Sequence, residues 1–135
     1  MSLTASARSI PGSLRQEILI DGKYRITTDE PETLGGDGSA AAPHELLPAA
    51  VAGCVSTTLV MYARRQEWDL GDVTVDVEYN HRSTPRRCEV EITLTGDLTA
   101  DQIERLEAVA EACPVRRSIE TGIEFDETLS VVALP

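Results

Sequence analysis

The sequence predicts an α+β domain in which helices lie on one side of an antiparallel sheet, in the order ββ-α-ββ-α-β. Three observations predict this class. Two β-prone runs flank an Asp-Gly pair, two later runs alternate apolar and polar residues, and two segments show helical spacing. The chain has 135 residues, so we expect a single domain with one core over residues 1–135.

The first predicted hairpin joins residues 14–20 to residues 23–28. The Asp-Gly pair between these runs is a strong hairpin signal, because both residues tolerate positive φ. Residues 1–12 show no clear period, and we expect a loose arm there. The glycine-rich stretch at 29–42 is predicted to be a loop, and it lacks the Lys-Ser/Thr pair that a phosphate-binding loop would carry.

The first predicted helix covers residues 43–67. Pro43 suits a first helical turn, and Glu45 suits the positive end of the helix dipole. Pro48 predicts a kink or a loosened first turn. Residues 46–63 carry no charge and reach the length of a membrane span, but their proline, glycine, hydroxyl and alanine content favours a helix buried in a protein core.

Two strands and a second helix are predicted to follow. Residues 73–80 and 87–94 alternate in period two, and the short link between them predicts an antiparallel hairpin. Residues 99–102 form a capping box that opens the second helix, which Pro114 ends. The apolar face of that helix is predicted to comprise Ile103, Leu106, Ala110 and Cys113. A short extra turn at 115–121 and a last strand at 123–132 complete the chain.

The first helix also predicts an oligomer. It is apolar nearly all round, and one small sheet with one other helix cannot cover every side of it. A homodimer that buries this helix between subunits is the simplest arrangement that does.

Composition excludes several classes of function. Lys plus Arg number 12 and Asp plus Glu 23, giving a net charge of −11, which disfavours nucleic acid and anionic membrane surfaces as partners. Aromatic residues make up 4% of the chain, so base stacking is also disfavoured. Three scattered cysteines do not make a disulfide scaffold, and the N-terminus shows no apolar signal segment, so we expect a cytoplasmic protein.

The three cysteines are the first candidates for chemistry. Cys88 follows the predicted core face of its strand, which favours plain packing, and Cys54 lies mid-helix among small residues. At Cys113 the end of a helix disfavours a thiolate while the two arginines that follow favour it, a setting that suits a resolving thiol. No CxxC pair is present, and His44 and His81 have no zinc spacing to two cysteines, so we expect neither a metal nor a cofactor.

Several segments resemble the OsmC/Ohr family, and more closely its general OsmC-like branch. They are Gly35-Gly36-Asp37-Gly38, Ala42-Pro43-His44-Glu45-Leu46-Leu47, Ala52-Gly53-Cys54, Met61-Tyr62-Ala63-Arg64-Arg65 and Ala112-Cys113-Pro114-Val115. The resemblance implies an antiparallel sheet wrapped around a long buried central helix. It also implies an intertwined homodimer with two active sites at the subunit interface.

The resemblance further implies a thiol peroxidase that reduces organic hydroperoxides. Cys54 resembles the peroxidatic cysteine, Cys113 the resolving one, and Glu45 a glutamate that pairs with an arginine. That arginine comes from the N-terminal part of the family's chains. Arg8, Arg15 and Arg25 are the candidates here, and Arg15 is our choice among them. The implied reductant is an external dithiol or a dihydrolipoyl protein, which reopens a Cys54–Cys113 disulfide.

Two other functions fit the same residues. The dimer could bind a small apolar ligand with its cysteines merely buried, and its thiols would then resist alkylation. It could instead be a redox sensor, which would oxidise readily but turn over poorly with every reductant.

Overall fold

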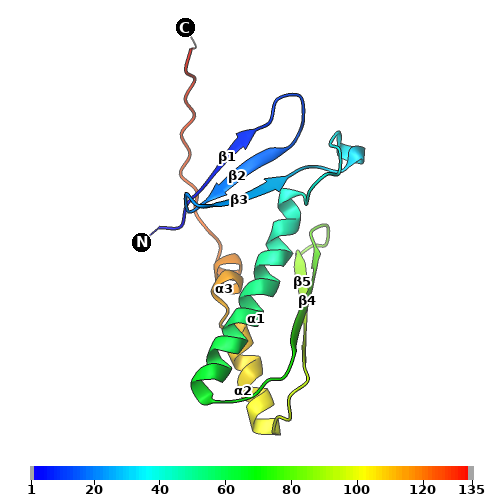
Figure 1. Cartoon of the computed structure of the whole chain (residues 1–135), viewed down its shortest axis with the longest axis vertical. Helices are drawn as coiled ribbons and strands as arrows, with labels where there is room; N and C mark the ends of the chain where they lie inside the picture. Colours follow the sequence, from blue (N-terminus) through cyan, green and yellow to red (C-terminus); the bar gives the residue numbers. More distant parts are fainter. Residues whose placement is uncertain (1, 134–135) are drawn as a thin grey trace. The chain divides into compact units, whose positions relative to one another are not determined.

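The computed structural model describes residues 2–133, which divide into two compact units. The first comprises the residues up to Ala52 together with Asp76–Glu91, and the second comprises Gly53–Val75 together with the residues from Ile92 onward. Figure 1 shows the elements in chain order. Antiparallel strands and a long helix confirm the predicted α+β class.

The first unit contains a three-stranded antiparallel sheet (Figure 1). Strand β2, Gln16–Ile20, pairs with β3, Tyr24–Thr28, and the turn between them has positive φ at Asp21 (53°) and Gly22 (66°). Two successive residues of positive φ are the signature of a type I′ hairpin turn. The hairpin that the Asp-Gly pair predicts is therefore confirmed.

The prediction of a loose N-terminal arm is wrong for part of residues 1–12. Strand β1, Ala5–Ser9, pairs with β2 from Ala5 opposite Ile20 to Ser9 opposite Gln16. All five residues of β1 are exposed, so the strand has no apolar face to produce an alternating pattern. Backbone pairing with β2 defines it, and that is not visible in the local sequence.

The loop after β3 is held by one buried carboxylate. Asp29 is 1% exposed and accepts hydrogen bonds from the backbone N–H groups of Glu30 (2.8 Å), Asp37 (3.3 Å) and Ser39 (3.0 Å) and from the Ser39 hydroxyl (2.7 Å). A Cβ added at Gly36 would overlap the carbonyl oxygen of Glu30, so the loop requires glycine there. Within this loop, Glu32–Leu34 forms a 3₁₀ turn, η1.

The same contacts give this loop a defined pH dependence. Hydrogen bonds from the Ser39 hydroxyl and backbone, with smaller ones from Glu30 and Asp37, lower the pKa of Asp29 to about 2. Because the folded pKa lies below the unfolded one, the stability is fully present above the unfolded pKa, near 4, and is lost as the pH falls through about 2.

We expect Asp29→Asn to remove that part of the acid dependence. The amide presents N–H groups to the donors of the loop, so the variant should also unfold at a lower temperature at pH 7. Thermal unfolding at pH 7, 4 and 3 measures both effects. Asp37→Asn, in the same loop but with an exposed side chain, is the matched control and should follow the wild type. Equal acid dependence in wild type and Asp29→Asn would contradict the prediction.

The long helix begins with a change of helix type. A 3₁₀ turn, η2, covers Pro43–Glu45, and α1 follows as Leu46–Gln66 (Figure 1). Pro48 lies in the first turn of α1, where a backbone N–H has no intrahelical acceptor. The predicted helix is confirmed, and the irregularity expected at Pro48 takes the form of this 3₁₀-to-α transition.

Helix α1 has one buried and one exposed apolar face. Segment Pro43–Gln66 is long and apolar enough to cross a membrane, a property that core helices of soluble proteins share. The exposed face includes Leu47, 42% exposed, and Met61, 56% exposed. The apolar sequence of α1 requires other residues to cover the helix on every side, and the described residues do not provide this cover. The buried side chains recur every fourth residue and are Val51, Val55, Leu59 and Ala63.

The second unit packs its core between α1 and α2. Helix α2, Ala100–Glu111, begins with the predicted capping box, in which the Thr99 hydroxyl accepts from the Gln102 N–H (3.2 Å) and the Gln102 side chain accepts from the Thr99 N–H (2.8 Å). Helix α3 is Pro114–Thr121. The buried apolar residues of this unit are Val55, Leu59, Ala63, Leu70, Leu106, Ala110 and Cys113.

The two predicted later strands are also present. Strand β4 is Val73–Asn80 and β5 is Arg87–Leu94, and together they form a two-stranded sheet. The last predicted strand, 123–132, is absent: residues 123–133 continue as a chain with neither helix nor strand (Figure 1). A strand exists only by pairing with another, and no described strand pairs with this segment. Its apolar residues are Ile123, Phe125, Leu129, Val131 and Val132, each 65% exposed or more.

Candidate active site

Cys54 and Cys113 come together in the second unit. Cys54 lies in the first half of α1 and is half-buried, whereas Cys113 is fully buried, with 0% of its surface exposed. Both are free thiols, and Cys113 is close enough to Cys54 to lower the pKa of Cys54 as a hydrogen-bond donor. The structure therefore places the two sequence-predicted thiols in one site.

Cys113 lies at the opposite kind of helix end from the one that the sequence predicts, and the expected effect of the helix dipole on its thiolate is therefore reversed. The sequence predicts that Cys113 closes a helix, but α2 ends at Glu111 and Cys113 is the N-cap of α3. Pro114 accordingly occupies the first turn of α3, where proline is favoured. The sulfur thus lies at the positive end of a helix dipole, which favours a thiolate rather than disfavouring it.

Three hydrogen-bonding groups lie around the Cys54 sulfur. Burial raises the pKa of Cys54, but the Cys113 thiol, the Val115 backbone N–H and the Thr58 hydroxyl lower it, and together they bring the pKa below its ordinary value. The Thr58 hydroxyl oxygen lies 3.9 Å from the Cys54 sulfur. This site therefore favours a thiolate at Cys54.

Cys113 has the opposite preference. Burial is the largest influence that raises the pKa of Cys113. The hydrogen bond that Cys113 donates to Cys54 and the charge of Cys54 raise this pKa further. Backbone N–H groups of Arg116 and Val115 lower it, but the net direction is upward. The pair thus holds one thiolate, at Cys54, and keeps the proton on Cys113.

Arg116 contributes to the site through its backbone. The sequence predicts that the side chains of Arg116 and Arg117 favour the Cys113 thiolate. The Arg116 guanidinium instead pairs with Glu120, with 3.1 Å between Nε and Oε1, and the Arg116 backbone N–H faces the Cys113 sulfur. The stabilising charge at this site is therefore the N-terminus of α3 rather than the Arg116 guanidinium.

Glu45 and Arg15, the other predicted site residues, belong to the first unit. Glu45 is exposed in η2, and its carboxylate accepts from the Ala42 N–H at 3.0 Å, which caps this turn. Arg15 is half-buried, and its Nε is buried without a hydrogen-bond partner among the residues described. No ion pair joins Arg15 to Glu45 in the described chain.

The other two candidate arginines lie on the sheet. Arg25 of β3 forms an exposed ion pair with Glu17 of β2. Arg8 of β1 stands opposite the same Glu17 in the strand register and is exposed. Of the three candidates, Arg15 is thus the one with a buried guanidinium nitrogen that lacks a partner in the described structure.

The third cysteine does not lie where its strand pattern predicts. Cys88 and Val90, two residues later, are exposed in β5, so the prediction that Cys88 packs in the core is wrong.

The two histidines stack on each other. The ring centroids of His44 and His81 lie 4.8 Å apart, and the ring of Tyr79 meets both edge-on. The described residues contain no group of three His, Cys, Asp or Glu side chains suited to a metal.

An apolar pocket of about 280 Å³ lies in the second unit. Neither Cys54 nor Cys113 lines it. Its lining residues are Leu59, Ile92, Leu94, Ile103, Leu106 and Glu107.

Two groups of the site were missed by the sequence analysis. Thr58 stands four residues after Cys54, and residues at that spacing share a helix face, so the sequence contains a signal for it. The Val115 backbone N–H has no residue-type signal, since any residue but proline would supply it.

Comparison with known proteins decides the family. The family model described as OsmC-like protein matches residues 36–128, which include both cysteines of the site. The chain belongs to the OsmC-like family. Among proteins with curated descriptions, a search finds no match.

Solved structures of OsmC-like proteins share the fold. A protein from Psychrobacter arcticus named for osmotic stress and detoxification response is 29% identical, with a TM-score of 0.72 over 87% of this chain and 88% of that one. An organic hydroperoxide resistance protein OsmC from Legionella pneumophila is 25% identical, with a TM-score of 0.61 over 88% and 89%. OhrB of Bacillus subtilis, also an organic hydroperoxide resistance protein, is 20% identical, with a TM-score of 0.55 over 87% and 90%.

Proposed function

We propose that this OsmC-like protein is a thiol-dependent peroxidase that reduces organic hydroperoxides to alcohols. The observation that carries the proposal is the Cys54–Cys113 pair, in which the accessible thiol has the lowered pKa and the buried one the raised pKa. Membership of a family with organic hydroperoxide resistance proteins supports the same substrate class.

The first step uses the Cys54 thiolate. The sulfur attacks one oxygen of the O–O bond, the bond breaks, Cys54 becomes a sulfenic acid, and the leaving alkoxide takes a proton to become the alcohol. Three hydrogen bonds hold the sulfur as a thiolate before attack, from Cys113, Val115 and Thr58. Two electrons pass from sulfur to the peroxide in this step.

The second step reverses the roles of the thiols. Once Cys54 is a neutral sulfenic acid, its charge and its accepting sulfur no longer raise the pKa of Cys113, and burial is the influence that still raises it. The N–H groups of Val115 and Arg116 remain, and both favour a Cys113 thiolate. Cys113 then attacks the Cys54 sulfur, water leaves, and a disulfide forms. An external dithiol, free or on a dihydrolipoyl protein, reopens it by exchange.

Arg15 and Glu45 complete the proposed site. A guanidinium next to Cys54 would stabilise both the thiolate and the leaving alkoxide, and Glu45 would hold that guanidinium by a bidentate ion pair. The buried, unpartnered Nε of Arg15 supports this choice among the arginines of the described chain.

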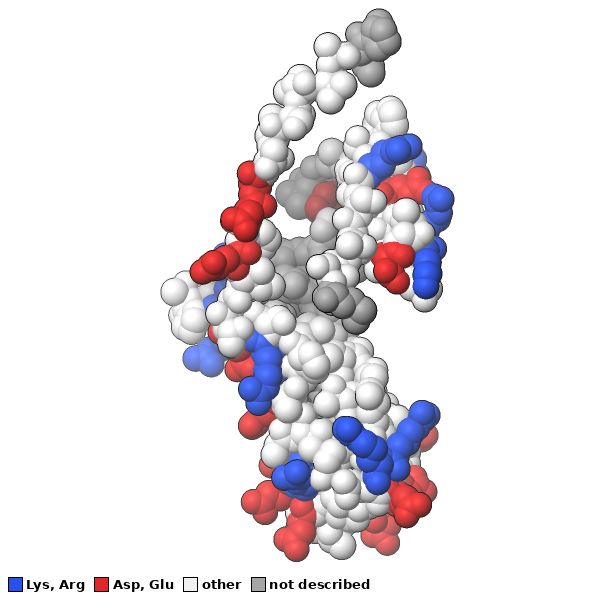
Figure 2. Space-filling model, turned by 90° about the vertical axis from the view of Figure 1, so that its left-hand side faces the viewer, with Lys and Arg blue, Asp and Glu red and all other residues white. Residues whose placement is uncertain are grey.

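We also propose that the protein acts as a homodimer. Two features support it: the exposed apolar face of α1, and the exposed apolar residues of segment 123–133. Figure 2 shows acidic side chains near the base of this extended segment and none toward its end, where residues 128–133 are uncharged. A second subunit would cover both apolar surfaces and supply the partner strand that segment 123–133 lacks.

A thiol count tests the chemistry directly. We expect one equivalent of cumene hydroperoxide to remove two thiols from the wild type, with a mass loss of two hydrogens and a Cys54–Cys113 disulfide in the peptide map. Cys88→Ser is the control and should lose the same two thiols, because Cys88 is exposed and outside the pair. Three intact thiols after treatment would sink the proposal, and oxidation without turnover on any dithiol would favour a redox sensor.

A further inference from the structure

Thr58 is placed to act on the reacting sulfur from within the same helix. It stands one turn after Cys54 on α1, and its hydroxyl oxygen lies 3.9 Å from the Cys54 sulfur. Thr58 is half-buried, between the fully buried Val55 and Leu59. Its branched Cβ restricts χ1, which limits the positions that the hydroxyl can take.

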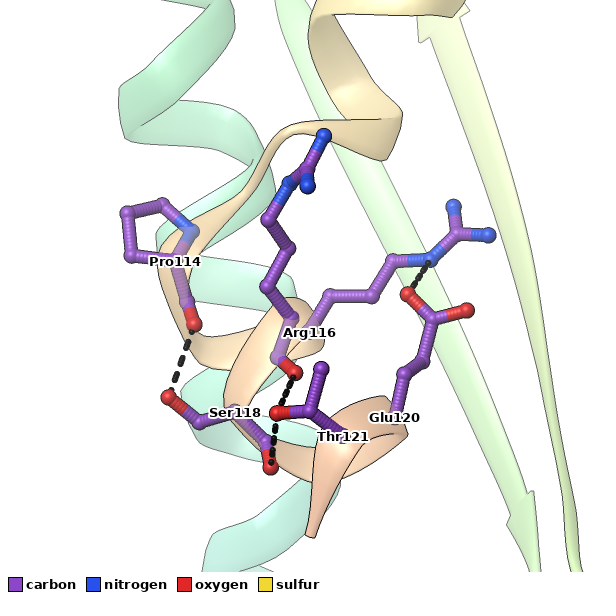
Figure 3. Close-up of polar contacts among 6 residues, drawn as sticks. Pro114, Arg116, Ser118, Glu120 and Thr121 are labelled. Atoms are coloured by element: carbon purple, nitrogen blue, oxygen red, sulfur yellow. Dashed lines mark hydrogen bonds and ion pairs between the residues drawn. The ribbon is translucent and has the colours of Figure 1, made fainter.

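Two hydroxyl residues of α3, Ser118 and Thr121, make a different contact. On α3 the Ser118 hydroxyl donates to the Pro114 carbonyl at 3.1 Å, and the Thr121 hydroxyl donates to the Arg117 carbonyl at 2.8 Å (Figure 3). Bonding to the carbonyl four residues earlier is the usual behaviour of serine and threonine inside helices. Among the described contacts, the Thr58 hydroxyl instead meets the side chain four residues earlier, and that side chain is Cys54.

We propose that Thr58 is a positioning residue that directs its hydroxyl hydrogen to the Cys54 thiolate and orients the sulfur for attack. The inference deepens the proposed function and rests on it for its catalytic consequence. A thiolate only accepts hydrogen bonds, so in the reactive state the hydroxyl is the donor. The proton that leaves Cys54 passes to solvent, and Thr58 keeps its own.

Thr58 differs in one respect from the other two donors to Cys54. The Cys113 thiol must give up its proton when it becomes the second attacker, and Val115 donates from α3. Thr58 is on α1 with Cys54, so it stays beside the sulfur while Cys113 changes roles. Its hydroxyl is therefore present as a donor each time the reductant regenerates the Cys54 thiolate.

The test is the pH profile of Cys54 alkylation by iodoacetamide, resolved by peptide mass mapping in a Cys88→Ser background. We expect Thr58→Val to alkylate roughly tenfold more slowly than the parent at pH 6, with its profile moved to higher pH, because one hydrogen bond to a charged sulfur is lost. Thr58→Ser keeps the hydroxyl and should restore the parent profile. Thr57→Val makes the same substitution at the exposed neighbouring threonine and should leave it unchanged.

Three results would overturn the proposal. They are a Thr58→Val profile that superimposes on the parent, equal shifts in Thr58→Val and Thr58→Ser, and an equal shift in Thr57→Val. If Thr58→Val does not fold by circular dichroism, Thr58→Ala against Thr58→Ser gives the same comparison. Alkylation needs no peroxide, so a protein that shows the shift but consumes no hydroperoxide would refute the proposed function and leave the Thr58–thiolate bond established.

Discussion

Cys113→Ser is expected to consume one equivalent of organic hydroperoxide and then stop. The Cys54 thiolate is still held by the Val115 N–H and the Thr58 hydroxyl, so the first attack proceeds. Without a second thiol the sulfenic acid cannot become a disulfide, and it persists or oxidises further. Intact mass should show one added oxygen, and a sulfenic-acid probe should label Cys54.

Cys54→Ser should lose the reaction altogether. A serine hydroxyl is far less nucleophilic than a thiolate, and Cys113 is fully buried with a raised pKa, so it does not substitute for Cys54. Coupled turnover with a dithiol should fall to background in Cys54→Ser, whereas Cys113→Ser, treated with hydroperoxide in the absence of any thiol, should gain one oxygen. A Cys54→Ser protein that still reduces hydroperoxide would assign the first attack to another cysteine.

Leu59→Ala is expected to lower the free energy of unfolding by about 3 kcal/mol, within the range for buried leucine truncations. Leu59 is 1% exposed and lies on the buried face of α1, five residues after Cys54. It also lines the apolar pocket, so the truncation enlarges an existing space rather than closing it. Urea denaturation of the full chain, followed by circular dichroism, measures the loss.

The matched control is Leu34→Ala. Leu34 is 67% exposed in η1, so the same substitution there should change the free energy of unfolding by less than about 0.5 kcal/mol. Equal losses in the two variants would mean that Leu59 is not a core anchor of α1. In addition, the alkylation rate of Cys54 in folded Leu59→Ala reports whether the packing of α1 also determines the position of the Cys54 sulfur.

Elements with strong local signals could be predicted from the sequence. The Asp21-Gly22 turn, the capping box at Thr99 and the alternation in β4 each arise from neighbouring residues, and each is present. Elements that depend on a partner could not be predicted in this way. Strand β1 has no buried face, and segment 123–133 has the apolar residues of a strand without a paired strand in the described chain.

The site shows the same division. Cys54 and Cys113 were found because cysteines are few and the segments around them resemble a family, and the structure brings them together. Where the charges lie could not be predicted, because it depends on where one helix ends and the next begins. Pro114 predicts the end of the second helix, but α2 already ends at Glu111 and Pro114 begins α3, which puts Cys113 at a helix N-terminus. Whether Glu45 and Arg15 act on Cys54 stays a prediction.

The unequal pKa values of Cys54, on α1, and Cys113, at the start of α3, also determine how many protons accompany the electrons. When the pH lies between the lowered pKa of Cys54 and the raised pKa of Cys113, the reduced pair of cysteines holds one proton rather than two. Reduction of the disulfide in that pH range therefore takes up two electrons and one proton. The reduction potential of the couple should then change by about 30 mV per pH unit, half the slope of an ordinary dithiol. Acidification would thus make the disulfide easier to reduce by only half as much as for a thiol pair that is fully protonated.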